Sequence, residues 1–306
     1  MPYPRLARTV GLVLTAGLLA ACGGGGGDPL AGSSGEQAPD DTIVVGSANF
    51  SENIILAEIY AQALEEAGVK TEKKLNIGSR ETYIPALQDG SIDLIPEYTG
   101  NLLLYFDSDA KVTKSDEVYE ALQQALPEGL VVLEKSSAED KDVLVVRQET
   151  AEKYDLETIA DLQRVDDQLV VGGSPEFAER RAGLKGLQEV YGLDFKEFKT
   201  LDAGGPLTVT ALKDGDVDVT QLFSTQPSIE QNNFVPLEDP KNIHIAQNIV
   251  PLANEDKVTP TVRETLNAVS AELTTEKLAE LVKRVDIDKE NPRDVAADWL
   301  QQADLN

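Results

Sequence analysis

One phrase occurs twice in this chain. ALQDGSIDLIPEYTG runs from Ala86 to Gly100, and ALKDGDVDVTQLFST runs from Ala211 to Thr225. In both copies Ala, Leu, Asp, Gly and a second Asp recur in register, followed by a hydrophobic run, an aromatic residue and a hydroxyl residue. An Asp-Gly pair between an amphipathic segment and a β-rich run is typical of a helix end, a turn and a buried strand. The repeat therefore predicts the same helix–turn–strand unit in each of two lobes.

Short β-rich runs alternate with amphipathic segments from Asp41 onward, and 306 residues are enough for two domains. We expect a helix from the N-cap Ser51 to Gly68, and another over 176–192. Alternation of this kind favours parallel α/β units with crossover helices. Strands are expected at TIVVGS (42–47), KKLNIG (73–78), SIDLIPEY (91–98), DVLVVR (142–147), QLVVGG (168–173), FKEFKTL (195–201), DVDVTQLF (216–223) and NIVPLAN (248–254), and three helices at 260–272, 275–284 and 292–302.

Composition excludes several classes of protein. The formal net charge is −27, from 27 Lys and Arg against 54 Asp and Glu, and such a surface repels phosphate backbones and anionic lipid, so we expect no nucleic-acid partner. One Cys and one His cannot build a disulfide or a Cys/His metal site. No GxSxG turn accompanies His244, which we interpret as an ordinary surface or packed histidine. We predict no catalytic residue, no metal, no cofactor and no enzymatic activity.

The N-terminal region has the features of an export signal. MPYPRLARTVGLVLTAGLLAAC has a basic start, then an apolar run that is too short to span a bilayer of about 30 Å. The sole cysteine follows in LAAC, which resembles a bacterial lipobox, so residues 1–21 are predicted to be a lipoprotein signal peptide and Cys22 to be lipidated. The alternative is a chance cysteine in an ordinary signal peptide. The Gly-, Ser- and Pro-rich segment 22–41 predicts a flexible tether on the extracytoplasmic face of a cell membrane.

The motifs of the two lobes resemble a known family. VVGSANFSENIILAEIYAQAL, ALQDGSIDLIPEYTGNLL, TIADLQRVDDQLVVGGSPEFAERRAG and ALKDGDVDVTQLFST are similar to the ProX-type glycine betaine/choline/carnitine-binding proteins of osmoprotectant ABC importers, over residues 42–303. The resemblance implies a periplasmic-binding-protein type II fold with a central cleft and two crossing hinge segments. Lobe 1 would comprise 42–145 plus 247–306, and lobe 2 would comprise 148–244. It also implies a monomer that captures a small polar solute and delivers it to permease subunits in the membrane.

Family members hold the quaternary ammonium in a cage of tyrosines, because a methylated cation has no hydrogen to donate, and bind the carboxylate of betaine with an arginine. Each aromatic face contributes about 0.5–2 kcal/mol. By this resemblance Tyr98 of PEYTG corresponds to one cage tyrosine, Phe223 lies near another, and Arg180 in EFAERRAG corresponds to the arginine.

Other family positions differ in this chain. Ala48 in SANF stands where the family has Lys, and Asn101 stands where it has Thr. Asp142 replaces an aromatic residue before the first crossing, and Gln247 or Asn248 replaces a tyrosine near the second. We therefore expect Asp142 to supply charge in place of a ring if the solute is a quaternary amine.

Three groups of residues form the predicted ligand site. The group that would supply hydrogen bonds comprises Asn49, Ser79, Asn101, Thr225, Gln247 and Asn248. Tyr98, Phe223 and Phe177 would supply aromatic or apolar surface, and Arg180, with Arg80, would hold an anionic group, although Arg80 is equally well explained as a structural residue at a helix start. The full set is Asn49, Phe50, Ser79, Arg80, Tyr98, Thr99, Asn101, Asp142, Phe177, Arg180, Phe223, Ser224, Thr225, Gln247 and Asn248.

The sequence leaves alternative functions open. The same receptor fold could bind a neutral polyhydroxylated or aromatic compound, which suits the polar replacements. A structural or adhesive lipoprotein with a vestigial cleft is a second class, and a cleft-bearing enzyme a third, although no nucleophile–base pair supports the latter.

Overall fold

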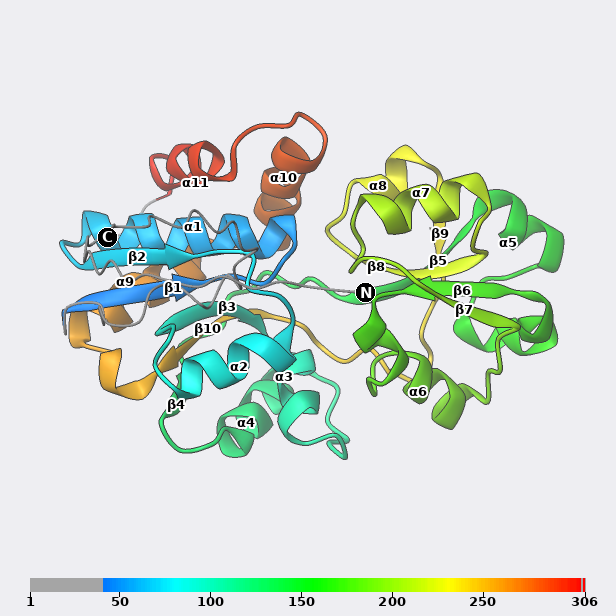
Figure 1. The fold of residues 1–306 in the computed structure, drawn as a ribbon, viewed down its shortest axis with the longest axis horizontal. Coiled ribbons are helices and arrows are strands. Elements are labelled where there is room, and N and C mark those ends of the chain that lie inside the picture. The colour runs from blue at the N-terminus through cyan, green and yellow to red at the C-terminus, as the bar shows by residue number, and fades with distance from the viewer. Residues whose placement is uncertain (1–40, 304, 306) are drawn as a thin grey trace, which may run out of the picture. The chain divides into compact units, whose positions relative to one another are not determined.

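The computed structural model describes residues 41–303 and 305, which form two mixed five-stranded sheets with helices packed around them (Figure 1). The predicted two-lobed α/β architecture is thereby confirmed. The predicted signal peptide, Cys22 and nearly all of the tether lie outside the described residues. Among the described residues, no helix combines the length and apolarity needed to cross a bilayer.

The first sheet has the strand order β2-β1-β3-β10-β4. Figure 1 shows α1 on one face of this sheet and α2 and α4 on the other. Its strands are β1 (Thr42–Gly46), β2 (Lys70–Lys74), β3 (Leu94–Tyr98), β4 (Leu130–Val132) and β10 (Ile249–Asn254), and its helices are α1 (Ser51–Glu66), α2 (Arg80–Gln88), α3 (Thr99–Phe106), α4 (Ser115–Ala125), α9 (Pro260–Glu272), α10 (Thr275–Asp286) and α11 (Pro292–Leu300).

The second sheet has the order β7-β6-β8-β5-β9, which matches the first sheet position by position. Its strands are β5 (Asp142–Arg147), β6 (Val170–Gly173), β7 (Glu197–Thr200), β8 (Val219–Phe223) and β9 (Phe234–Pro236), and its helices are α5 (Gln148–Tyr154), α6 (Leu184–Gly186), α7 (Pro206–Asp214) and α8 (Ser228–Gln231), with 3₁₀ turns at Ile159–Arg164, Asp166–Gln168 and Pro175–Ala178 and a π-helical turn at Leu187–Tyr191. A further 3₁₀ turn, Glu255–Lys257, follows β10.

The repeated phrase occupies the same place in both sheets, as α2–β3 in the first and α7–β8 in the second. Gly90 and Gly215 have φ values of 76° and 80°, a conformation that glycine adopts at little cost. The second Asp of each copy accepts a backbone N–H from the neighbouring strand: Asp93 from Val44 at 2.8 Å, and Asp218 from Val170 at 2.9 Å. The repeat therefore encodes a helix stop and an anchored strand start.

The chain passes between the two sheets twice, and each passage ends in a strand that is antiparallel to its neighbour. After β4 the chain enters the second sheet as β5, and after β9 it returns to the first as β10. Gly100 leaves room for the returning segment, because a Cβ at this position would lie 2.5 Å from the carbonyl oxygen of Ala246.

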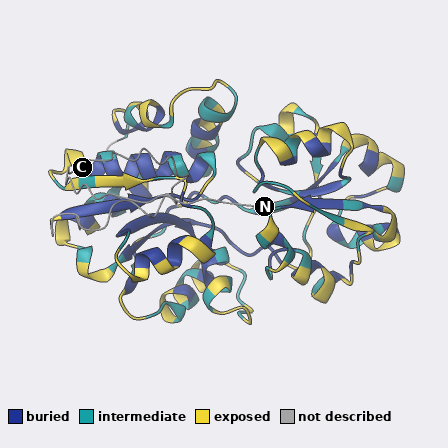
Figure 2. Cartoon of the chain, in the orientation of Figure 1, coloured by how far each residue is buried: buried dark blue, intermediate teal, exposed yellow. Residues whose placement is uncertain are grey.

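Each lobe has its own apolar core, and burial follows the layers, with the inner strands buried and the outer helix faces exposed (Figure 2). In the first lobe α1 packs with Trp299, which is 7% exposed, as expected for a packed aromatic residue. In the second lobe two clusters pack around β5, β6 and β8. Near-continuous burial along β1 and β3 is typical of strands covered on both faces.

Several local expectations are wrong. The segment 176–192 is a series of short turns rather than one helix. The first boundary is misplaced, because β5 pairs within the second sheet although 142–145 was expected in the first lobe. Phe50, and not Ser51, is the cap position of α1, and it makes no side-chain cap hydrogen bond. The predicted parallel units are confirmed, since β1 runs parallel to β2 and β3, and β6 to β7 and β8, although β10 and β5 add antiparallel pairs.

Candidate ligand-binding site

A cavity of about 960 Å³ opens at the carboxyl ends of strands from both sheets. It is lined by residues that directly follow β1, β6 and β8, together with Tyr98 at the end of β3. Ligands of open α/β sheets bind beyond the carboxyl ends of the strands, because the loops there are free to vary while the sheet holds them in place. This cavity is therefore the candidate site.

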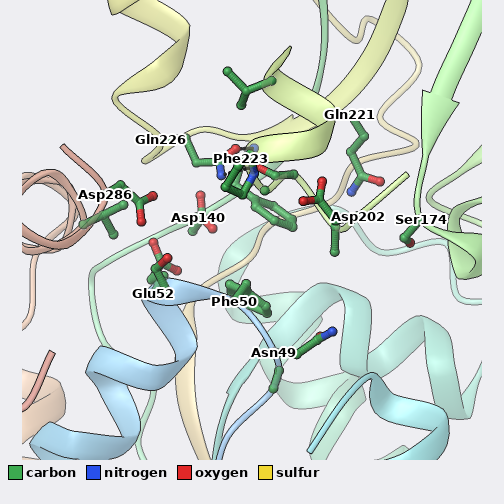
Figure 3. Close-up of a pocket in the computed structure, with 18 of the residues that line it drawn as sticks. Asn49, Phe50, Glu52, Asp140, Ser174, Asp202, Gln221, Phe223, Gln226 and Asp286 are labelled. Atoms are coloured by element: carbon green, nitrogen blue, oxygen red, sulfur yellow. Dashed lines mark hydrogen bonds between the residues drawn. The ribbon is translucent and has the colours of Figure 1, made fainter. Parts of the chain in front are cut away.

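Three aromatic rings gather in the cavity. Phe50 precedes α1, and its ring stacks on that of Phe223 with centroids 5.4 Å apart and an interplanar angle of 26°. The ring of Tyr98 lies 6.0 Å from that of Phe50. Figure 3 shows Phe50 and Phe223 approaching from different elements. Aromatic faces carry partial negative charge, so this cluster can attract a cation.

Two buried carboxyl groups lie beside the rings and point toward one another in Figure 3. Glu52, in the first turn of α1, accepts hydrogen bonds from the hydroxyls of Tyr98 (2.8 Å) and Thr225 (2.6 Å). Asp140 accepts from the backbone N–H of Thr225 at 3.0 Å and from the Ser224 hydroxyl at 3.3 Å. Thr225 thus bridges both acids.

Burial raises the pKa of Glu52, and it raises the pKa of Asp140 well above its usual range. Removal from water penalises the charged form of a carboxyl group, and the two acids add mutual repulsion to that penalty. The hydroxyl of Thr225 opposes the effect on Glu52 by stabilising its carboxylate. Burial also raises the pKa of Tyr98 well above its usual range, so its hydroxyl remains a donor.

Arg80 lines the cavity, but its charge is already matched. Its Nε lies 2.9 Å from Oε1 of Glu97 and its Nη2 lies 2.7 Å from Oε2, in a bidentate pair. Both side chains are buried, and Tyr83 donates a further hydrogen bond to Glu97 at 2.7 Å. Burial would lower the pKa of Arg80, but the Glu97 carboxylate more than offsets this and raises it. The buried bidentate pair with Glu97 therefore supports the structural role considered for Arg80.

Arg180 also lines the cavity and is paired at the surface. Its Nη2 lies 3.0 Å and 3.2 Å from the two carboxylate oxygens of Glu81. The side chains are 34% and 47% exposed, so solvent screens the pair and its contribution is small.

Asp142 is held by three amide groups. Asn101 donates to Oδ2 at 2.7 Å, Gln247 donates to the same oxygen at 3.3 Å, and Gln221 donates to Oδ1. The Gln247 side chain in turn accepts the backbone N–H of Asn101 at 2.9 Å. The polar replacements noted in the sequence therefore bind one another, and together they link α3, the segment before β10, and strands β5 and β8 of the second sheet.

The cavity brings most of the predicted site residues together. Those that line it are Asn49, Phe50, Ser79, Arg80, Tyr98, Asn101, Asp142, Arg180, Phe223 and Thr225; those that do not are Thr99, Phe177, Ser224, Gln247 and Asn248. Phe177 packs in the core of the second lobe against Phe198, with centroids 6.4 Å apart, since the turn that carries it folds inward.

The remaining four residues have local partners. The Thr99 hydroxyl accepts from the N–H of Asn248 at 3.0 Å, and the Asn248 side chain accepts from Ser115 at 2.6 Å. Ser224 supports Asp140 and is exposed, and Gln247 is fully buried behind Asp142. These residues build the walls behind the cavity.

The cavity lining also contains acidic residues that sequence reasoning missed. Glu52, Asp140, Glu176, Asp202 and Asp286 line the cavity, together with the amides Gln221 and Gln226. Glu52 was hidden because a carboxylate in the first turn of a helix is ordinary, and the others because acids are so numerous. Glu176 and Asp202 follow strands β6 and β7, which could have drawn attention to them. Asp140 lies in a passage between the sheets and Asp286 ends α10. With Asp142, six acids line the cavity against three cations: Arg80, Arg180 and Lys289.

Comparison with known proteins is consistent along the whole described chain. Residues 41–302 match the family model of the substrate-binding domain of the ABC-type glycine betaine transport system. The carnitine transport binding protein OpuCC of Listeria monocytogenes is 28% identical, covering 95% of this chain and 94% of that protein. The glycine-betaine-binding protein of Pseudomonas aeruginosa is 30% identical, covering 88% and 90%. A crystal structure of a glycine betaine/carnitine/choline ABC transporter protein shares the fold, with 23% identity, a TM-score of 0.67, and coverage of 85% and 98%.

Proposed function

Since the chain belongs to the family of substrate-binding domains of ABC-type glycine betaine transport systems, and so is a component of an osmoprotectant importer and not an enzyme, we propose that its solute is a quaternary ammonium compound. The solute would lie in the cavity with its methylated nitrogen against Phe50, Tyr98 and Phe223. Choline, glycine betaine and carnitine are the candidates, because proteins similar to this chain carry those names.

The observation that carries the proposal is the aromatic cluster beside buried acids. A quaternary ammonium has no N–H to donate, so ring faces and carboxylates are the groups that can hold it. Both arginines of the cavity are paired with carboxylates, so neither is a free counter-charge for an anionic solute. A net cationic or zwitterionic solute fits this charge pattern better than an anion.

The alternatives receive less support. A neutral polyhydroxylated solute would need free hydrogen-bonding groups, whereas Asn101, Gln247 and Asp142 are hydrogen-bonded to one another. A vestigial cleft in a structural or adhesive lipoprotein is harder to reconcile with a cavity of about 960 Å³, which is within the size range of functional sites.

We further propose the organisation in which this receptor works. The two sheets would mark two lobes, with passages at 133–141 and 237–248, and closure of the lobes on the solute would present both to the permease. Cys22 would be lipidated after removal of residues 1–21, and the segment that follows would tether a monomeric receptor to the outer face of the cell membrane.

Calorimetry with choline, glycine betaine and carnitine tests the solute class, and thermal melts provide a second readout. Ligand at 100 times its dissociation constant stabilises a protein by about 2.7 kcal/mol. We expect saturable binding by at least one of the three and a rise in the melting temperature. Binding of a neutral sugar or polyol, with no response to any quaternary amine, would contradict the proposal. Mass spectrometry of the membrane fraction tests the lipid on Cys22.

A further inference from the structure

We infer that Glu52 and Asp140 select the charge of the solute by proton exchange: the pair holds one proton when no solute is bound, and releases it when a cation enters the cavity. This inference rests on the proposed function, because it takes the cavity around the pair as the solute site. It adds a proton to the binding reaction and assigns charge selection to two residues whose presence in the site was not expected from the sequence.

The geometry places two carboxyl groups where only one charge is easily kept. Both residues are 4% exposed, and their carboxyl groups point toward one another in Figure 3. Thr225 holds both, through its hydroxyl to Glu52 and its backbone N–H to Asp140. Two buried carboxylates in such contact titrate as a pair and share a proton over a wide pH range.

Few cations oppose the pair. On the α1 and β3 side it faces the Tyr98 hydroxyl, which is a donor without charge. Asp286, at the end of α10, adds negative charge near Glu52. Lys289 lines the cavity beyond α10, but its Nζ is bound to the carbonyl oxygen of Asp286 at 2.6 Å.

In the passage that carries Asp140, the neighbouring Lys141 and Glu139 pair with one another at 3.3 Å. Among the described residues that line the cavity, Arg80 and Arg180 are already matched by Glu97 and Glu81. None of these lining cations is hydrogen-bonded or ion-paired to Glu52 or Asp140, so a proton or a cationic solute can supply the charge.

The proposed exchange of a proton for a cationic solute conserves both atoms and charge. The O–H bond of the protonated carboxyl breaks, its electrons stay on the carboxylate, and the proton passes to a base in solution. The trimethylammonium group, held against Phe50 and Phe223, then neutralises the added negative charge. A neutral solute of the same shape offers no such compensation, so the pair would keep its proton.

Calorimetry on the full chain with choline and with 3,3-dimethylbutanol, its neutral isostere, tests this. Titrations between pH 5 and 8, each in buffers of low and high ionisation enthalpy, give the number of protons released. We expect up to about one proton per choline, and affinity that rises up to about tenfold per pH unit where the pair titrates. For the isostere we expect no proton release and affinity that changes less than about twofold.

The double variant Glu52→Gln/Asp140→Asn keeps the shape of both side chains and removes both titratable groups, so choline should bind without proton release. Glu189→Gln is the matched control, because Glu189 is an exposed acid that does not line the cavity. It should retain the release seen in the wild type. Thermal melts establish that each variant folds, and the comparison of the two ligands on the wild type does not depend on the variants.

The outcomes separate the two claims. Choline binding without proton release at every pH, equal release with the isostere, or release that persists in the folded double variant would each overturn the inference and leave the proposed function intact. Failure of choline, glycine betaine and carnitine to bind would overturn the proposed function, and this inference with it.

Discussion

The hydroxyl of Thr225 donates a hydrogen bond to Oε2 of Glu52 over 2.6 Å, and this contact joins the end of β8 to the first turn of α1. Thr225 is 4% exposed, so the bond is shielded from water. Thr225 belongs to the second copy of the repeated phrase, whereas Glu52 lies between β1 and the first copy. The repeat therefore does more than shape each sheet, because its final hydroxyl links the two lobes at the cavity.

Replacing Thr225 by Val keeps the shape of the side chain and removes the donor. Removing a hydrogen bond from a buried carboxyl group lowers the free energy of unfolding by about 1–3 kcal/mol. We expect a loss of that size in the free energy of urea unfolding. Thr261→Val, the same substitution at an exposed position of α9, should change it by less than about 0.5 kcal/mol. Equal effects of the two variants would show that the Glu52 contact is not special.

Breaking the buried pair of Arg80 and Glu97 should be costly. Arg80→Met leaves the Glu97 carboxylate buried without its partner, and such a change costs about 3–5 kcal/mol. Arg180→Met breaks the exposed pair with Glu81 and should cost less than about 1 kcal/mol. Chemical denaturation of both variants measures the difference. Similar losses would contradict the contrast in burial between the two pairs.

The aromatic cluster should carry affinity. Phe50→Ala and Phe223→Ala each remove a ring worth about 0.5–2 kcal/mol to a cation, so choline binding should weaken by about 2- to 30-fold. Leu207→Ala is the control, because Leu207 is an apolar side chain, 65% exposed, that does not line the cavity. Unchanged calorimetric affinity in both Phe variants would place the solute elsewhere.

The stability of the ligand-free protein should depend on pH through the acid pair. Burial raises the pKa of Glu52 and Asp140, so the folded state binds more protons than the unfolded chain, whose carboxyls ionise near pH 4. Their contribution to stability is present below about pH 4 and is lost as pH rises through the folded pKa values, by about 1.4 kcal/mol per proton and pH unit.

Other carboxyls shift in the opposite direction, so the difference from a variant isolates the pair. At Glu81 burial raises the pKa, but hydrogen bonds outweigh this effect and the pKa is lowered. Hydrogen bonds also lower the pKa of Asp161. Glu52→Gln/Asp140→Asn should therefore gain stability relative to the wild type as pH rises from 4 to 8. A difference that stays constant across this range in urea unfolding would argue that the pair does not titrate there.

Much of the fold could be predicted from local pattern. The Asp-Gly turns with their flanking runs located α2–β3 and α7–β8, and the apolar spacing located α9, α10 and α11 to within a few residues. The segment 176–192 failed because its amphipathic spacing suited a helix while the backbone folds back on itself. A Cβ at Gly183 would lie 2.0 Å from the Phe177 carbonyl oxygen, and one at Gly186 would lie 1.8 Å from that of Arg181.

The residues of the candidate site also differ in how far the sequence predicts them. Phe50, Tyr98 and Phe223 stand in motifs that end at strand termini, so their convergence followed from the repeat and the resemblance. Asp140 stands in a passage between sheets without any pattern of its own, and nothing nearby in the sequence distinguishes it from the other acids. Its significance arises only from contact with Glu52 and Thr225.

By itself, the sequence determined two similar α/β lobes, the carboxyl-end position of the candidate site and the membership of its family, because turns, periodicity and motifs are short-range properties. Only the tertiary structure decided the charge of that site. Arg80 meets Glu97, Arg180 meets Glu81, and Asp142 meets three amides across gaps of 17 to 105 residues. Charges and hydrogen bonds depend on distance in space and on burial, and neither can be read from spacing along the chain.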